Sequence, residues 1–472
     1  MPRNLIVIVG DTLRHPRFVP TFDGQPAMPF LESVARRAAV LPRLVSSSSW
    51  TCPSHASLLT GVDTWETHFY LSATHHSMPK VTSLAERWRA AGGQSVAFSG
   101  NFLVAPEIGT APGYDAYNPG LLAKTAGAAQ QALTTIGYER LLHRVERRMR
   151  THARPTLGAR AAVNAVEFLG TGMYSAINQM RRGSAINGAM RRALRGRRDP
   201  RPVHLFVNFA EPHEPYLLRQ RGENGRIGVG HLPSINLARH IDYLAPADLG
   251  DRFLRAYVAS VRELDDQLET AFRTFERAGL LQDAVVLFIA DHGQSLGEHG
   301  FYGHGHYLYD ELIEVPGYLL EYRGGRPVEL RSPKTDWVDL RHVNDLLASA
   351  GPHGEPLDIE GTLTESLARK GPAGSYWEGP LPRSPRGFLY QPARSEIYRL
   401  LRVRRGDRAA LVTDGAPESA PRILPEESGA PSDPELADIA FARLGKAHEA
   451  AAAPSTTLSQ DVDERLKSWG YD

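Results

Sequence analysis

The sequence is short of cysteine, of lysine and of long apolar runs. Among 472 residues there is a single cysteine, Cys52, so no disulfide can form within the chain, and we expect a cytoplasmic, reducing location. The apolar run at the N-terminus is only six residues long, which is too short for the apolar region of a signal peptide. No stretch approaches the roughly 20 apolar residues that a transmembrane helix needs. These shortages argue against a disulfide-stabilised secreted domain and against a membrane-spanning protein. Nothing in the sequence indicates the oligomeric state.

The chain as a whole has no excess of either charge, but positive charge is concentrated in one segment. The chain has 54 basic and 53 acidic residues, so no global field selects nucleic acid or membrane as a partner. Residues 138–201 differ, with 15 arginines, no lysines and four acidic residues. We interpret about 125–201 as a basic helical insertion that could contact a polyanion. Because the whole chain has only six lysines, a solvated helical face with arginine as the default cation is the simpler interpretation.

Three apolar runs, residues 4–11, 203–213 and 284–293, end in polar residues and are typical of strands buried on both faces. Between the second and third, apolar residues recur every three or four positions up to Gly279, which predicts an amphipathic helix. Alternating strands and helices predict an α/β fold, a three-layer α/β/α sandwich with a mostly parallel central sheet. We assign residues 1–350 to a catalytic domain. Residues 351–472 are assigned to a small C-terminal α+β subdomain and tail, with a hairpin at 396–415.

Polar residues gather where these strands end, and ligands of such sheets bind at the carboxyl ends of strands. Asp11 and His213 follow the first two runs, and Asp291 and His292 follow the third together. A glycine-rich loop with further histidines comes next, in "IADHGQSLGEHGFYGHGHYLYDELIEVP". Carboxylate and imidazole groups are ligands for divalent cations, so we expect a metal site here.

The only cysteine lies in "SSSSWTCPSHASLLTGVDT", residues 46–64. Pro53 is suited to the first position of a helix that ends at Gly61, with Thr51 or Cys52 at its start. Backbone N–H groups and the positive end of the helix dipole would meet there, as in many sites for phosphate or sulfate.

In order along the chain, these motifs resemble the sulfatase/alkaline-phosphatase superfamily, and in particular its sulfatase-like phosphoester hydrolases. The similarity is carried by "LIVIVGDTLR", "SWTCPSHASLLTG", "AFSGN", "FVNFAEPHEPY" and the block at 265–316. It implies an alkaline-phosphatase-like fold and a hydrolase that acts on a small anionic ester. The metal ligands that it implies are Asp11, Thr51, Asp291 and His292. The residues around the transferred group would be Asn101, His213 and either His304 or His306.

The resemblance also bears on the choice between Thr51 and Cys52. Sulfatases have Cys-x-Pro-x-Arg and oxidise the cysteine to formylglycine, but here Thr51 has the place two residues before Pro53, and His55 has the place of the arginine. We therefore do not expect formylglycine, and we assign catalysis to Thr51, His213 and His55. The Asp-x-x-x-His element that would bind a second zinc is replaced by Glu211 and Pro215, so we expect one divalent metal ion: Mn, Zn, Mg or Ca.

The predicted activity is metal-dependent cleavage of a phosphate monoester or diester through a covalent phospho-Thr51 intermediate, with His213 or a loop histidine protonating the leaving oxygen. Two alternatives stay open. The enzyme could be a sulfate-ester hydrolase, or it could transfer the phospho group from the same nucleophile to an alcohol.

Overall fold

The computed structural model describes most of the chain. The described residues are 2–119, 183–214, 249–380, 397–414, 422–424 and 432–452, apart from 20, 23, 68, 70–80, 102, 107–109, 111, 198, 301 and 355. The predicted insertion at about 125–201 therefore lies largely outside the described residues. Its described end is α7 (Gly183–Leu194), which buries Ile186, Ala189 and Met190 and exposes Arg191 and Arg192. Among the described residues, no helix is both long enough and apolar enough to cross a membrane.

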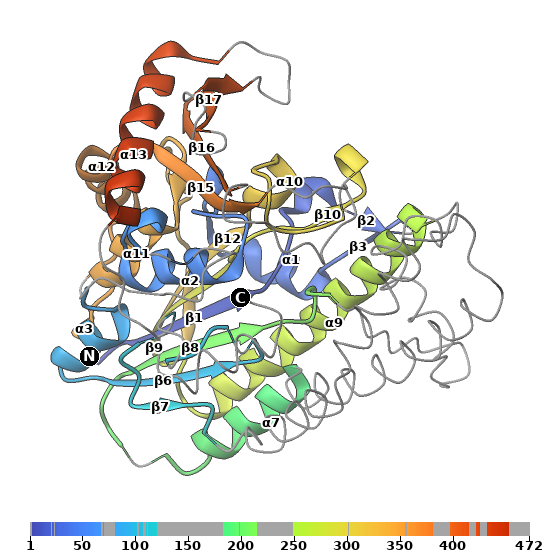
Figure 1. Cartoon of the computed structure of the whole chain (residues 1–472). Coiled ribbons are helices and arrows are strands. Elements are labelled where there is room, and N and C mark those ends of the chain that lie inside the picture. The colour runs from blue at the N-terminus through green and yellow to red at the C-terminus, as the bar shows by residue number, and fades with distance from the viewer. Residues whose placement is uncertain are drawn as a thin grey trace, which may run out of the picture.

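An eight-stranded sheet lies at the centre of the molecule (Figure 1). Its strands, in spatial order, are β13 (Arg326–Val328), β12 (Gly317–Arg323), β9 (Asp283–Ala290), β1 (Asn4–Gly10), β8 (Val203–Phe209), β6 (Gln94–Ser99) and β7 (Ala116–Tyr117), with β4 (Ala39–Val40) paired to β12. β9, β1, β8, β6 and β7 run parallel, and β12 is antiparallel to β9. The mostly parallel central sheet is thus confirmed.

The three apolar runs form the middle of this sheet, as predicted. β8 is buried throughout, and β1 and β9 are buried at every residue except the first. Gly10 is level with Ala290 on one side and with Phe209 on the other. Because the three strands end at the same level, the residues that follow them emerge together at one edge of the sheet.

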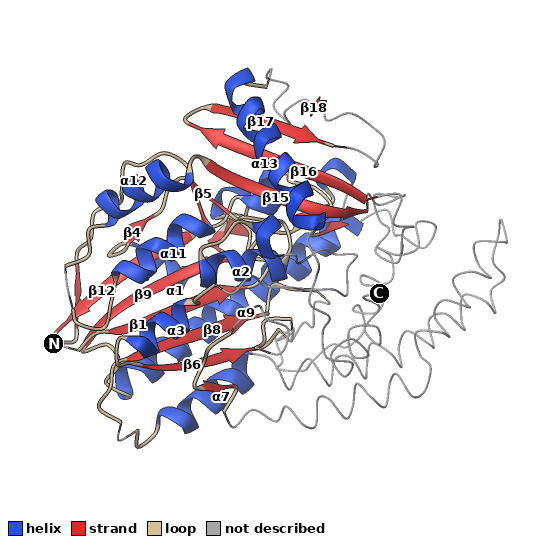
Figure 2. Ribbon diagram, turned by 60° about the vertical axis from the view of Figure 1, so that its left-hand side comes forward, coloured by secondary structure: helices blue, strands red, loops and turns tan. Residues whose placement is uncertain are grey.

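Helices cover both faces of the sheet, which confirms the three-layer sandwich (Figures 1 and 2). On one face, α9 (Leu249–Arg277) packs against α7 and α1 (Pro29–Ala35). The other face carries α2 (Thr51–Thr60), α3 (Leu84–Ala90), α11 (Leu340–Ser349) and α12 (Ile359–Lys370). The amphipathic helix expected before Gly279 is α9. Gly279, with a φ of 71°, follows its end in the left-handed region that glycine adopts without strain.

A second, antiparallel sheet follows toward the C-terminus. It contains β15 (Ala373–Pro380), β16 (Ile397–Arg405), β17 (Arg408–Thr413) and β18 (Arg422–Leu424), and α13 (Pro434–Ala452) packs against it. β16 and β17 form the predicted hairpin. Tyr376 of β15 donates a backbone hydrogen bond of 2.8 Å to the carbonyl of Ser47, so this sheet contacts the segment that precedes Thr51. The domain boundary near residue 350 stays a prediction.

Short elements complete the described chain. They are β2 (Thr21–Phe22), β3 (Gln25–Pro26), β5 (Leu44–Val45), β10 (Ser295–Leu296), β11 (Tyr302–Gly303), β14 (Val338–Asp339), α10 (Asp310–Ile313) and the 3₁₀ helices Pro16–Phe18, Thr64–Thr67 and Glu298–Gly300.

Candidate active site

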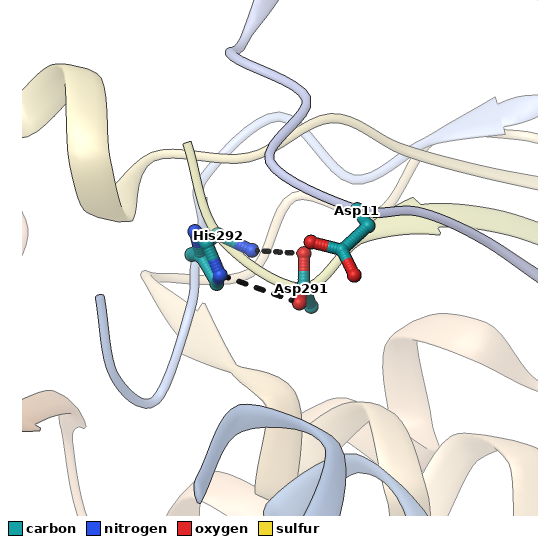
Figure 3. A group of neighbouring side chains, drawn as sticks. All are labelled: Asp11, Asp291 and His292. Atoms are coloured by element: carbon teal, nitrogen blue, oxygen red, sulfur yellow. Dashed lines mark hydrogen bonds and ion pairs between the residues drawn. The ribbon is translucent and has the colours of Figure 1, made fainter. Parts of the chain in front are cut away.

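Asp11, Asp291 and His292 form a buried cluster at the shared edge of β1 and β9 (Figure 3). Each side chain offers a ligand atom, and these atoms all lie within 4.8 Å of one another. All three residues have no exposed surface. The structure therefore brings together the two carboxylates and the imidazole that the sequence singled out as metal ligands.

The hydrogen bonds of the two carboxylates fit a divalent cation. Asp11 Oδ2 accepts a bond of 2.7 Å from the amide of Asn101, and Asp291 Oδ1 accepts from the backbone N–H groups of Thr12 (3.1 Å) and His292 (2.8 Å). The other oxygens, Asp11 Oδ1 and Asp291 Oδ2, are buried and have no hydrogen-bond partner among the residues that the structure describes, although Nδ1 of His55 and Nε2 of His292 each lie 3.4 Å from Asp291 Oδ2. Burial raises the pKa of Asp291 to about 6, although the two N–H groups act against that shift. Buried carboxylate oxygens without donors are costly, and a cation would offset that cost.

Thr51 lies beside this cluster, with Oγ1 3.2 Å from Nε2 of His292. It is the first residue of α2, because Trp50 is extended (φ −143°, ψ 149°). Pro53 is thus the third residue of the helix, and its predicted place at the first position was wrong. Proline is tolerated there because N–H groups in the first turn have no partner within the helix. Trp50 gives α2 no side-chain cap, so the end of α2 at Thr51 suits an anion.

Cys52 is the next residue of α2 and is 1% exposed. Burial raises the pKa of its thiol well above the ordinary range, and the carboxylates of Asp11 and Asp291 raise it further. The thiolate, which is the nucleophilic form, is therefore disfavoured. This placement is typical of a cysteine that packs as a small hydrophobic residue.

His304 and His213 extend the group of side chains that begins with His292, the histidine that contacts Thr51. The ring of His304 stacks on His292 at 4.7 Å and meets the ring of His213 edge-on at 4.8 Å. Burial acts to lower the pKa of His213, but the carboxylates of Asp11 and Glu214 outweigh burial, and the pKa is raised. Burial lowers the pKa of His304 to about 4. His213 is thus the better proton donor of this pair.

His55 and His306 make contacts of a different kind from those of His213 and His304. His55 is fully buried, with Nδ1 2.9 Å from the carbonyl of Thr51 and 3.4 Å from Asp291 Oδ2, so it lies between the first turn of α2 and a metal ligand. His306 packs against Trp377 of β15, at 5.4 Å between ring centroids. The structure therefore groups His304, rather than His306, with His213 and His292.

Several neighbours of the site were not predicted. Gln294 and Glu214 contact His304, and Asn208 Nδ2 lies 3.4 Å from Nε2 of His55. Glu214 directly follows His213, and Gln294 is three residues after Asp291. Both residues lie within motifs that the sequence analysis singled out, which was an available signal. The sequence alone, however, does not show that they contact each other or His304.

Comparison with known proteins places the chain in a family. The family model described as Sulfatase matches residues 3–120 and 183–343, and the gap between the two parts falls in the predicted basic insertion. The choline-sulfatase of Rhizobium meliloti (strain 1021) is 31% identical over 119 residues, which are 22% of this chain and 23% of that protein. The iduronate 2-sulfatase of Mus musculus is 30% identical over 116 residues, 22% of this chain and 20% of that protein. The chain thus matches under a quarter of the length of these relatives.

Solved structures are similar over nearly the whole chain. The phosphonate monoester hydrolase of Agrobacterium radiobacter has a TM-score of 0.55 and 15% identity and covers 97% of each chain. The phosphonate monoester hydrolase of Silicibacter pomeroyi has a TM-score of 0.57 and 16% identity, again over 97% of each chain. At these identities the likeness concerns the fold, which is alkaline-phosphatase-like. With the family model matching more than half of its residues, the chain belongs to the sulfatase family.

Proposed function

We propose that this sulfatase-family hydrolase cleaves a phosphate ester, either a monoester or a diester, with Thr51 as the nucleophile. The observation that carries the proposal is the 3.2 Å contact between Thr51 Oγ1 and His292, beside the carboxylates of Asp11 and Asp291. The neighbouring Cys52 thiol is buried and has a raised pKa, so it is poorly suited to the same task.

Asp11, Asp291 and His292 would bind one divalent cation, with Thr51 as a further ligand. When bound, that cation supplies a Lewis acid that favours ionisation of the Thr51 hydroxyl and offsets charge on the phosphoryl oxygens. Two oxygen ligands and one nitrogen ligand suit Mn, Zn, Mg or Ca. Asn101 supports Asp11 through the 2.7 Å bond to Oδ2, and its contact with the transferred group remains a prediction.

The remaining steps belong to the chain's own residues. Thr51 loses its hydroxyl proton to solvent water, its oxygen bonds to phosphorus, and the bond to the leaving oxygen breaks. His213 donates the proton that the leaving oxygen takes up, which its raised pKa favours. Water then attacks phosphorus and loses a proton, the bond from phosphorus to Thr51 breaks, and Thr51 regains a proton. N–H groups at the start of α2 stabilise the phosphoryl oxygens during both displacements.

A sulfate-ester hydrolase is the second candidate, and the matches to choline-sulfatase and iduronate 2-sulfatase favour it. Peptide mass spectrometry of residues 46–61 distinguishes the two, because a formylglycine derived from Cys52 supports a sulfatase and an unmodified Cys52 in active protein opposes it. A transferase that uses Thr51 would instead form a new ester when an acceptor alcohol is added. The cytoplasmic location, which rests on the single cysteine, and contact of the basic segment with a polyanion remain predictions.

The test is a substrate panel of aryl phosphate monoesters and diesters, aryl phosphonates and aryl sulfates, each assayed with Mn²⁺, Zn²⁺, Mg²⁺ and Ca²⁺. We expect the highest kcat/KM with a phosphate ester, loss of at least about 10³-fold in Thr51→Ala, and little change in Cys52→Ala. Activity that survives Thr51→Ala but is lost in Cys52→Ala would refute the assignment of the nucleophile.

A further inference from the structure

The histidines of the site share one feature: each bonds through Nδ1 to an oxygen acceptor. The pairs are His55 with the carbonyl of Thr51 (2.9 Å), His292 with the carbonyl of Gly293 (2.9 Å), His213 with the carbonyl of Glu214, and His304 with Oε1 of Gln294 (3.0 Å). A carbonyl oxygen can only accept, so in each neutral ring the proton must be on Nδ1 and the lone pair on Nε2.

His304 differs from the other three in how this arrangement is maintained. Its partner is a side-chain amide, which could present either its oxygen or its nitrogen. The nitrogen of Gln294, however, donates a hydrogen bond to Oε2 of Glu214. A carboxylate only accepts, so the amide nitrogen must face Glu214 and the amide oxygen must face His304. The other carboxylate oxygen, Oε1, lies 3.6 Å from Nδ1 of His304.

The three side chains come from different segments and are withdrawn from solvent. Glu214 follows β8, whereas Gln294 and His304 belong to the segment after β9. Glu214 is 7%, Gln294 0% and His304 6% exposed. A buried carboxylate is unfavourable unless hydrogen bonds and charge satisfy it, and here its contacts lead to a histidine that stacks on a proposed metal ligand.

We propose that Glu214 and Gln294 are positioning residues for His304. The carboxylate orients the amide, and the amide fixes the imidazole with its proton on Nδ1, so that Nε2 lies on the ring edge opposite Gln294 as the proton-accepting atom. In other enzymes, too, a group that hydrogen-bonds to the far nitrogen of a functional histidine fixes the tautomer and the orientation of the ring.

The role of this arrangement rests on the proposed function. In the second displacement, Nε2 of His304 takes a proton from the attacking water: a water O–H bond breaks, an N–H bond forms, and the water oxygen bonds to phosphorus. The bond from phosphorus to Thr51 breaks, and His304 then returns the proton to the Thr51 oxygen. Glu214 offsets the positive charge on the ring while the proton is there.

The first test measures the proton position directly. Protein labelled with ¹⁵N-histidine and loaded with Zn²⁺ or Mg²⁺ is examined by NMR at pH 8, with His304→Gln used to assign the His304 signals. We expect a protonated Nδ1 and an unprotonated Nε2 in the wild type, and loss of that single form in Glu214→Gln. Glu311→Gln is the matched control, because Glu311 is equally buried nearby and bonds to Ser295. A bare Nδ1 in the wild type, or an unchanged pattern in Glu214→Gln, would overturn the proposal.

The second test is kinetic. Glu214→Gln is expected to lower kcat by about 10- to 100-fold with KM within about twofold, and to cause no further loss in the His304→Gln background. Losses that multiply in the double variant would overturn the positioning role. The proposed function fails separately, if Thr51→Ala retains full activity. In that case the NMR result still decides whether Glu214 and Gln294 fix the ring.

Discussion

Asp291→Asn is expected to have a higher unfolding free energy than the wild type when metal is removed, and a lower one when metal is present. Asparagine retains the oxygen that accepts from the N–H groups of Thr12 and His292, and it replaces only Oδ2, which has no hydrogen-bond partner in the described part of the chain. Without a cation, the buried charge of Asp291 opposes folding. The substitution removes that charge and leaves the accepting geometry in place.

The magnitude follows from the pKa of Asp291, which burial raises to about 6, against about 3.9 for an ordinary aspartate. Two units correspond to about 3 kcal/mol of unfolding free energy at pH 7. Because the folded chain binds this proton more tightly than the unfolded chain, the penalty is largest above pH 6. It shrinks as the pH falls and is gone below the unfolded pKa. At pH 5 the advantage of the variant should be about half as large.

The assay is urea unfolding of wild type and variant in EDTA at pH 7 and pH 5, repeated with saturating Mn²⁺. A cation present at 1,000 times its dissociation constant adds about 4 kcal/mol to the wild type, which exceeds the variant's advantage of about 3 kcal/mol at pH 7 and should reverse the order of stability. Asp283→Asn, at the opposite end of β9, is the control. A metal-free variant that is less stable than wild type at pH 7, or an order that Mn²⁺ leaves unchanged, would refute the reasoning.

Three further outcomes are expected. Asp339→Asn should lower the unfolding free energy by about 3 kcal/mol at pH 7, since buried Asp339 bonds to Arg341 at 2.6 Å; an unchanged urea midpoint would contradict this. Because the pKa of Asp339 is well below its usual range, that contribution is present above the unfolded pKa and is lost as the pH falls below it. Cys52 should resist a thiol reagent in folded protein and react on unfolding; rapid labelling of native protein would count against its burial. Asn101→Ala should weaken Mn²⁺ binding by about tenfold, because Asp11 loses its donor, and calorimetry showing unaltered affinity would argue otherwise.

The sheet and its ligand edge could be predicted because their signals are local. Runs such as residues 4–10 are continuously apolar because helices cover both faces of the strand. A polar residue after each run marks the point where the strand leaves this covered part of the sheet. The parallel registry of β1 with β8 and β9 then brings Asp11 and Asp291 together without further information. The grouping of Asp11, Asp291 and His292, three of the predicted metal ligands, needed no knowledge of loop geometry.

Contacts made through loops could not be predicted in the same way. The choice between His304 and His306 depends on a turn in which Gly303, Gly305 and His306 all have positive φ, and spacing alone does not reveal how such a turn aims its side chains. Gln294 and Glu214 are 80 residues apart in the chain, so their contact is a product of tertiary packing. The start of α2 was misplaced by two residues because proline is compatible with several positions in the first turn.

The most direct test of the account is to trap the covalent intermediate. Metal-loaded enzyme is mixed with its best phosphate-ester substrate, quenched in acid within milliseconds and digested, and the peptide spanning residues 46–61 is sequenced by mass spectrometry. The account predicts a phosphoryl group on Thr51 and an unmodified Cys52. A modification on any other residue, or formylglycine in place of Cys52, would contradict it.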